Sequence, residues 1–252
     1  MLAASFAGGR PVPRGGVLLI GLATTAQLAG LVAFSIRFGE LPLVGLAPSL
    51  STLTFLIAAF FFAASLARDA RPVGLVLLPV IALLLGIALA LGVEPAGEVL
   101  AFRGVWFAFH VVLAFVGLAG FAFVFAAGLL YLLQFRELKS KRFGRVFRFF
   151  PPLNTLDALG RGAAVVGFGA LTVALALGWA WTIRFDNSLA LRDPQVLWSG
   201  ITWLVFAGVL GARMGGPASD RRAALVSVIG FGIVVLSYVV LRIAMSGFHS
   251  LV

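Results

Sequence analysis

Two histidines are the only imidazoles among the 252 residues, and they are the side chains best suited to chemistry. His110 ends the aromatic stretch Trp106–His110, and His249 stands close to the end of the sequence. A neutral imidazole is a common metal ligand, and paired axial side chains are a known mode of haem ligation. A histidine near the end of a membrane helix more often hydrogen-bonds to water or a carbonyl. The residues alone therefore leave both interpretations open.

The sequence offers few other reactive groups. It contains no Cys, which excludes disulfides, thiolate metal sites and Cys nucleophiles. A structural zinc ion requires four ligands, which two histidines and a few carboxylates do not supply. Neither a Ser-His-acid triad nor an acid–base pair in a pocket is visible. We therefore predict no catalytic residues. We favour a protein that carries a cofactor or regulates another protein over an enzyme that acts on its own.

Long apolar segments must position the histidines. Hydrophobic residues make up 62% of the chain and charged residues 11%, whereas a soluble domain carries about 25% charged residues. A spanning helix needs about 20 apolar residues. Seven runs satisfy this length, at residues 16–36, 46–67, 72–92, 104–134, 162–183, 196–212 and 223–245. We predict an all-α, polytopic membrane helix bundle in the cell (inner or plasma) membrane, with residues 1–252 as one integral membrane domain.

Loop charges predict the orientation of this bundle. With a cytoplasmic N-terminus, 14 of the 19 basic residues fall on cytoplasmic segments, as the positive-inside rule requires. Seven spans then place the C-terminus on the outer face. The net charge of +10 therefore reflects topology and contact with the lipid bilayer, and we expect no nucleic-acid partner. No Ala-x-Ala cleavage site follows a short apolar segment, so no removable signal peptide is expected.

The same orientation places both histidines on the outer side, although neither was used to assign it. Aromatic and basic side chains collect at that level. The aromatic ones are Trp106, Phe107, Phe109, Trp179, Trp181, Trp198, Trp203 and Phe248, and the basic ones are Arg103, Arg184, Arg192 and Arg242. A haem requires an apolar slot, aromatic walls and cations for its propionates, so these side chains could line one. Interfacial Trp and snorkelling Arg are also typical of membrane proteins without haem. Arg242 lies inside an apolar run, which favours a functional role with a propionate or Asp193 as counter-ion.

The longest connection, residues 135–160, combines basic residues with several phenylalanines. Such a segment is typical of a loop that lies on anionic lipid. The stretch from Arg136 to Arg148 could instead dock a cytoplasmic partner. A small-molecule transporter is disfavoured, because no pair of Gly- or Pro-interrupted helices surrounds a polar site at the membrane midplane.

Several ordered motifs are similar to those of one family. They are the stretches Leu153–Arg161, Gly167–Thr172, Gly178–Trp181, Asp193–Leu204 and Ser246–Ser250. Their order and spacing resemble the cytochrome c assembly membrane family, which includes CcsA, CcmC and the HemX/YpjD-like proteins. The resemblance covers a core at residues 104–252, and the helices within residues 16–92 match only in apolar character.

The resemblance implies a polytopic haem-handling protein. In the CcsA branch a Trp-rich segment with an Asp forms an external platform for haem, and two outer histidines ligate the iron. His110 and His249 match those ligands, and Asp193 with the Trp179 to Trp203 segment matches the platform. The family string Trp-Asp-Pro-Lys-Glu reads Arg192-Asp193-Pro194-Gln195-Val196 here. This depleted platform favours the HemX-like branch, whose members are implicated in tuning haem biosynthesis or in cytochrome assembly.

We therefore expect a haem-binding integral membrane protein that handles b-type, non-covalently bound haem for cytochrome c assembly or haem homeostasis. His110 and His249 would be the metal ligands, and Arg103 and Arg242 would pair with the propionates. Other cytochrome c assembly components or a haem-biosynthesis enzyme would be the protein partners. The alternative is a haem-free regulatory or structural membrane subunit that docks a soluble partner through its basic cytoplasmic loop.

Overall fold

The computed structural model describes residues 15–67, 70–95, 104–141, 149–185, 194–215 and 220–249, without the side chains at 67, 185, 194, 195 and 239–249. Within these ranges the regular elements are helices, and no strand is present, which confirms the predicted all-α bundle. The long helices are α2 (Gly15–Phe38), α3 (Leu46–Ala67), α4 (Gly74–Leu91), α5 (Val105–Ser140), α7 (Leu153–Phe185), α8 (Pro194–Met214) and α9 (Asp220–His249). A 3₁₀ turn, η1 (Arg71–Val73), leads into α4. All seven long helices have the length and hydropathy of membrane spans, so the chain is a multi-pass membrane protein.

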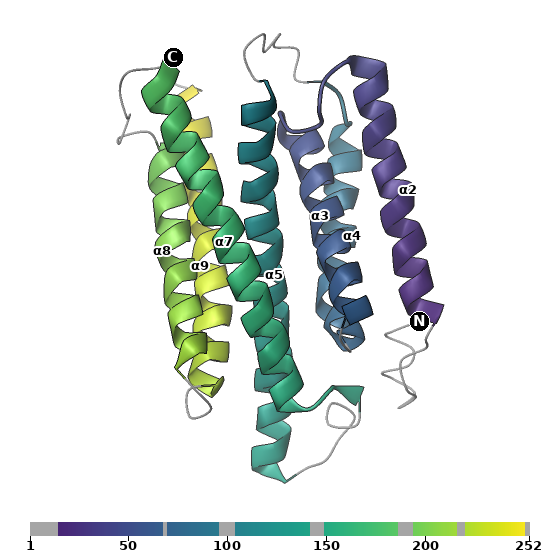
Figure 1. The fold of residues 1–252 in the computed structure, drawn as a ribbon, viewed down its shortest axis with the longest axis vertical. Helices are drawn as coiled ribbons and strands as arrows, with labels where there is room; N and C mark the ends of the chain where they lie inside the picture. Colours follow the sequence, from purple (N-terminus) through teal and green to yellow (C-terminus); the bar gives the residue numbers. More distant parts are fainter. Residues whose placement is uncertain are drawn as a thin grey trace.

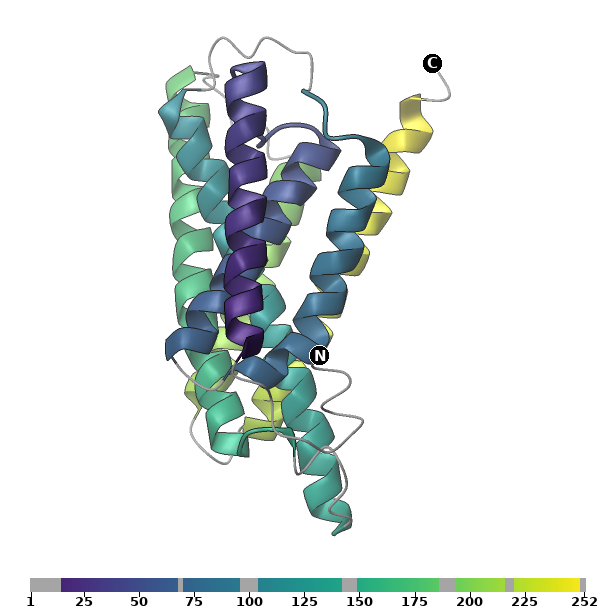
Figure 2. The same ribbon diagram turned by 90° about the vertical axis from the view of Figure 1, so that its right-hand side faces the viewer.

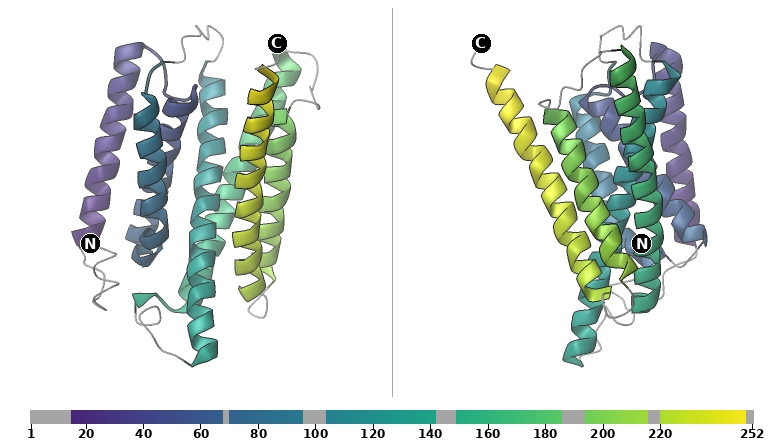
Figure 3. Two further views of the ribbon diagram at one scale, coloured as in Figure 1. Left: turned by 180° about the vertical axis from the view of Figure 1, so that it is seen from behind. Right: turned by 60° about the vertical axis from the view of Figure 1, so that its left-hand side comes forward.

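Successive helices run in opposite directions through the bundle (Figure 1). We call the end where α5 begins the His110 end, and α2, α4, α7 and α9 finish there (Figure 1). Helix α5 is central, because it packs against α7 and α9 on one side and against α3 on the other (Figure 1). The last turns of α9 lean away from the other helices at the His110 end (Figures 2 and 3).

Two helices extend further than the apolar runs predicted. Helix α7 begins at Leu153, nine residues before the predicted run, because Asp157 and Arg161 form an ion pair within the helix instead of ending it. Helix α5 continues to Ser140 and projects beyond its neighbours at the end opposite His110 (Figure 1). At about 1.5 Å per residue its 36 residues span about 54 Å, well over a bilayer core. The predicted connection at residues 135–160 is correspondingly shorter.

Small residues bring α5 and α7 into close contact. A Cβ atom added at Gly120 would lie 2.8 Å from Gly167 Cα, and one added at Gly117 would lie 3.1 Å from Gly167 O. Without a hydrophobic driving force between helices in lipid, such close backbone packing is a main source of association. Beside this contact, Phe121 of α5 stacks on Phe206 of α8, with ring centroids 4.5 Å apart. The α5–α7 pair is therefore the rigid frame that holds His110.

Candidate functional site

His110 is fixed by a hydrogen bond to the neighbouring helix. It lies in the second turn of α5, and its Nδ1 is 2.7 Å from the main-chain oxygen of Ala174 on α7. A carbonyl oxygen can only accept, so Nδ1 carries the hydrogen and donates it. The neutral ring then has its lone pair on Nε2, for which the described residues offer no partner. This is the arrangement in which second-shell hydrogen bonds orient metal-ligating histidines.

The surface of α7 is shaped to receive this ring. A Cβ atom at Gly178 would lie 2.7 Å from His110 Cε1 and 3.0 Å from Nδ1, so only glycine leaves room for the imidazole. One turn before His110 on α5, Trp106 Nε1 donates to the main-chain oxygen of Leu177 at 3.0 Å. Trp106 and His110 are four residues apart and therefore share one helix face, which they both direct onto α7. Sequence reasoning placed Trp106 among the aromatic side chains at this level but missed Gly178 and Ala174 as parts of the site.

The predicted tryptophans occupy three different places. Trp203 Nε1 donates to Thr172 Oγ1 at 3.0 Å, so this indole lies where α8 meets α7. Trp198 Nε1 donates to the main-chain oxygen of Val234 at 3.4 Å, where α8 meets α9. Trp179 and Trp181 lie on the last turns of α7, with Trp179 exposed and Trp181 half-buried. Only the α7 tryptophans share the immediate neighbourhood of Gly178, and the other two join helices.

Four predicted site residues lie wholly or partly outside the residues that the structure describes. Arg103 and Asp193 lie outside the described residues. Arg242 and His249 belong to the last turns of α9 at the His110 end, and their side chains lie outside the described part of the chain. The two histidines therefore come from segments at one end of the bundle, as the topology predicts, and their ligation of a common iron stays a prediction.

A second polar cluster lies toward the end opposite His110, among α7, α8 and α9. Arg213 NH1 is 3.4 Å from Asp157 Oδ1, and the two side chains are 2% and 7% exposed. Arg213 Nε and NH2 also donate to Ser227 Oγ, at 3.2 and 3.0 Å. Asp157 accepts a second ion pair from Arg161 at 2.7 Å, whose side chain is 45% exposed. The cluster therefore satisfies a buried guanidinium with one carboxylate and one hydroxyl.

The charge count includes Arg213 among the 14 basic residues of the cytoplasmic segments. In the structure Arg213 lies in the last turn of α8 and is buried, so it is not a solvated loop residue. Its guanidinium faces Gly160, where an added Cβ atom would clash with it. The spacing of Asp157 and Arg161 could have indicated a helical ion pair, but nothing in the sequence pairs Asp157 with a residue 56 positions later.

Comparison with known proteins identifies the family to which this chain is similar. The pattern of the family described as "Cytochrome C assembly protein" matches residues 43–249, which is most of the chain. The chain belongs to the cytochrome c assembly protein family. The match takes in α3 to α9 and leaves out α2. It confirms the resemblance drawn from the motifs and extends it to α3 and α4, which the sequence analysis had matched only in apolar character.

Individual relatives support the same family. The chain is 35% identical to the cytochrome c biogenesis protein CcsA of Synechococcus elongatus over 97 residues, which are 38% of this chain and 30% of the relative. It is 27% identical to CcsA of Chlamydomonas reinhardtii over 150 residues, which are 60% of this chain and 41% of the relative. For CcsA of Nostoc punctiforme the identity is 34% over 97 residues, 38% of this chain and 28% of the relative. The chain thus spans less than half the length of the curated relatives it matches.

Proposed function

We propose that the protein binds haem within the membrane and handles it for cytochrome c assembly or haem homeostasis. His110 on α5 and His249 at the end of α9 are the proposed axial ligands. The observation that carries the proposal is the hydrogen bond from His110 Nδ1 to Ala174 O at 2.7 Å, which leaves Nε2 as the free ring nitrogen. Membership of the cytochrome c assembly family supports the same role.

The residue types around His110 are those that a macrocycle needs. Gly178 makes room for the imidazole itself against α7, and Trp106 is hydrogen-bonded to α7 one turn away. Trp179 presents an exposed indole one residue beyond Gly178, which supplies an aromatic surface at the same level. Haem iron is held through its axial ligands, and their identity and hydrogen bonding tune its redox potential. The carbonyl of Ala174 fixes the tautomer and the ring orientation of His110, which is the role that a second-shell partner would have at an iron ligand.

The remaining site residues have proposed roles that follow from their chemistry. Arg103 and Arg242 would pair with the propionates, because a guanidinium binds a carboxylate through two parallel hydrogen bonds. Asp193 would orient one of these arginines or a neighbouring indole. Trp181 would extend the aromatic surface of Trp179. Trp198 and Trp203 hold α8 against α9 and α7, so they would support the site through the bundle.

The decisive experiment is an absorbance spectrum of the protein purified in mild detergent. We expect a Soret band with the low-spin pattern of two histidine ligands. His110→Ala and His249→Ala should each convert this spectrum or abolish haem retention, and His110→Ala with added imidazole should recover the low-spin form. Thr25→Ala is the control, because it removes one side-chain hydrogen bond, to Gly21 O, on α2, a helix that the proposed site does not use.

The outcomes separate the two leading functions. An unchanged spectrum in both histidine variants would remove them as ligands. If the purified wild-type protein is folded but contains no haem, the chain is better explained as a haem-free regulatory or structural subunit. In that case, deletion of residues 142–148 should change the set of cytoplasmic proteins that copurify with the chain.

A further inference from the structure

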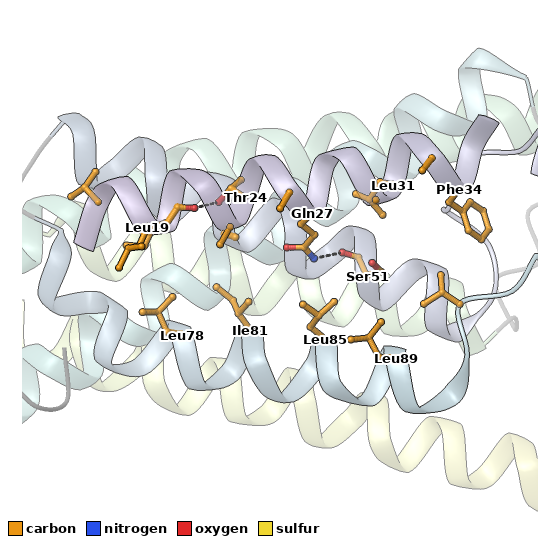
Figure 4. Close-up of a pocket in the computed structure, with 18 of the residues that line it drawn as sticks. Leu19, Thr24, Gln27, Leu31, Phe34, Ser51, Leu78, Ile81, Leu85 and Leu89 are labelled. Atoms are coloured by element: carbon orange, nitrogen blue, oxygen red, sulfur yellow. Dashed lines mark hydrogen bonds between the residues drawn. The ribbon is translucent and has the colours of Figure 1, made fainter. Parts of the chain in front are cut away.

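A groove runs between α2 and α4 at the edge of the bundle farthest from the histidine site. Its volume is about 970 Å³, at the upper end of the range for small-ligand sites (Figure 4). Leu31 and Phe34 form one wall from α2, and Ile81, Leu85 and Leu89 form the other wall from α4 (Figure 4). Residues of α3 form its base.

The groove exists because α2 is attached to α3 and barely touches α4. Gln27 makes the attachment near the middle of α2, where its Nε2 donates to Ser51 O at 3.1 Å (Figure 4) and to Thr54 Oγ1 at 2.8 Å. Leu89 is 66% exposed, whereas Leu31, Phe34 and Ile81 are 7–9% exposed. The groove is therefore open along one side, and its inner walls are covered by the helices.

An apolar space of this size must be filled. If the space is empty, the atoms that line it lose van der Waals contacts. Water does not fill it stably, because the walls offer few polar partners. In a membrane the surrounding medium is lipid, so an acyl chain is the apolar material at hand. The aliphatic walls of Leu31, Ile81 and Leu85 match such a chain in polarity.

Arginines line the groove at both ends, Arg71 just before α4 and Arg37 where α2 ends. Arg71 is half-buried, whereas Arg37 is exposed and accessible to a headgroup. The Arg37 guanidinium lies 5.2 Å from the centre of the Phe38 ring. In the described part of the chain this guanidinium has no carboxylate partner, although Glu40 and Glu94 lie at the same end. Ten residues separate Gln27 from Arg37, which is about 15 Å along the helix and about half of a 30 Å hydrocarbon core. A chain whose phosphate meets Arg37 therefore ends near Gln27.

We propose that the groove between α2 and α4 is a binding site for one anionic phospholipid from the leaflet at the His110 end. The phosphate binds Arg37, and one acyl chain packs along Phe34, Leu31, Leu85 and Leu89. The bound lipid supplies the packing between α2 and α4 that the protein lacks, so α2 is held by Gln27 on one side and by lipid on the other.

The test is native mass spectrometry of the full-length protein released from nanodiscs of equal parts phosphatidylglycerol and phosphatidylcholine. We expect one retained phosphatidylglycerol per chain. Leu85→Trp fills the groove and should abolish retention, whereas Leu83→Trp should not, because Leu83 lies on α4 outside the groove and is 64% exposed. Arg37→Gln should reduce the preference for phosphatidylglycerol about tenfold, as expected for a charge-assisted hydrogen bond. Arg184→Gln, at another exposed arginine of the same end, should retain it.

Three results would overturn the proposal. They are equal lipid retention by Leu85→Trp and the wild type, equal retention of both phospholipids by the wild type, and a dimer mass that Leu85→Trp removes. The last would assign the groove to a second copy of the chain. The absorbance spectrum of Leu85→Trp should match that of the wild type, so failure here is distinguishable from failure of the haem proposal.

Discussion

His110 and Ala174 join the two helices of the site, because the imidazole Nδ1 donates to the Ala174 carbonyl oxygen across 2.7 Å. The bond determines which ring nitrogen is free and how the ring is turned. It also makes the position of His110 depend on the separation of α5 and α7, which Gly117, Gly120 and Gly167 keep small. The geometry of the proposed ligand therefore depends on residues deeper in the bundle.

Gly178→Ala should disturb this geometry directly. The new methyl group would lie 2.7 Å from His110 Cε1, so the ring must turn away from Ala174. We expect haem retention to weaken by about tenfold or more, as for loss of a second-shell partner. The measurement is a haem titration followed at the Soret band.

Gly169→Ala is the control for this substitution. Gly169 lies on the same helix, and nothing lies within 4 Å of its added Cβ atom. It should bind haem as the wild type does and should gain a little helix stability, up to about 1 kcal/mol. Equal loss of haem in both variants would mean that the effect comes from α7 as a whole and not from contact with His110.

The sequence predicts the helices well and their contacts poorly. An apolar run of about 20 residues can be recognised without knowing its neighbours, so all seven spans were predicted. The orientation that loop charge indicates stays a prediction. Contacts such as Asp157 with Arg213 join residues far apart in the sequence, and the types of the residues do not identify the partner. The longer course of α7 was missed for the same reason, because Asp157 reads as a loop residue until its partners are known.

In the proposed site, too, the sequence indicated some residues and not others. His110 was singled out because the chain has only two histidines and both lie at one end of the bundle. Gly178 could not be singled out among 30 glycines, because its importance comes only from the ring that rests on it. Trp198 and Trp203 were grouped with the haem slot by their residue type, whereas their indole nitrogens join α8 to its neighbours.

Asp157→Asn should destabilise the bundle strongly. It removes the negative charge beside Arg213, whose side chain is 2% exposed and then loses its ion-pair partner. Loss of one member of a buried pair costs about 3–5 kcal/mol of unfolding free energy. Denaturation in detergent, followed by circular dichroism, measures the change.

Arg161→Gln is the comparison for Asp157→Asn. The Arg161 side chain is 45% exposed and its pair with Asp157 is screened by solvent, so its loss should cost much less than the loss of the buried pair. Adding Arg213→Met to Asp157→Asn should restore much of the lost stability, because the uncompensated charge is then absent. A double variant less stable than Asp157→Asn alone would show that Arg213 stabilises the bundle without the ion pair.

Gly120→Ala should separate α5 from α7. The added Cβ atom would lie 2.8 Å from Gly167 Cα, and backbone cannot move aside as a side chain can. Overpacking of this kind costs about 1–3 kcal/mol. Gly162→Ala on α7 has nothing within 4 Å and should be neutral or stabilising. Thermal unfolding of both variants, with the wild type beside them, tests whether the α5–α7 contact limits stability.

The orientation of the bundle can be measured because the chain contains no Cys. Gly104→Cys and Ser140→Cys place single thiols at exposed positions beside opposite ends of α5. The positive-inside distribution predicts that the first lies outside and the second in the cytoplasm. A membrane-impermeant maleimide added to intact cells should label Gly104→Cys, and it should label Ser140→Cys only after permeabilisation. The reverse pattern would place both histidines on the cytoplasmic side and require haem handling there.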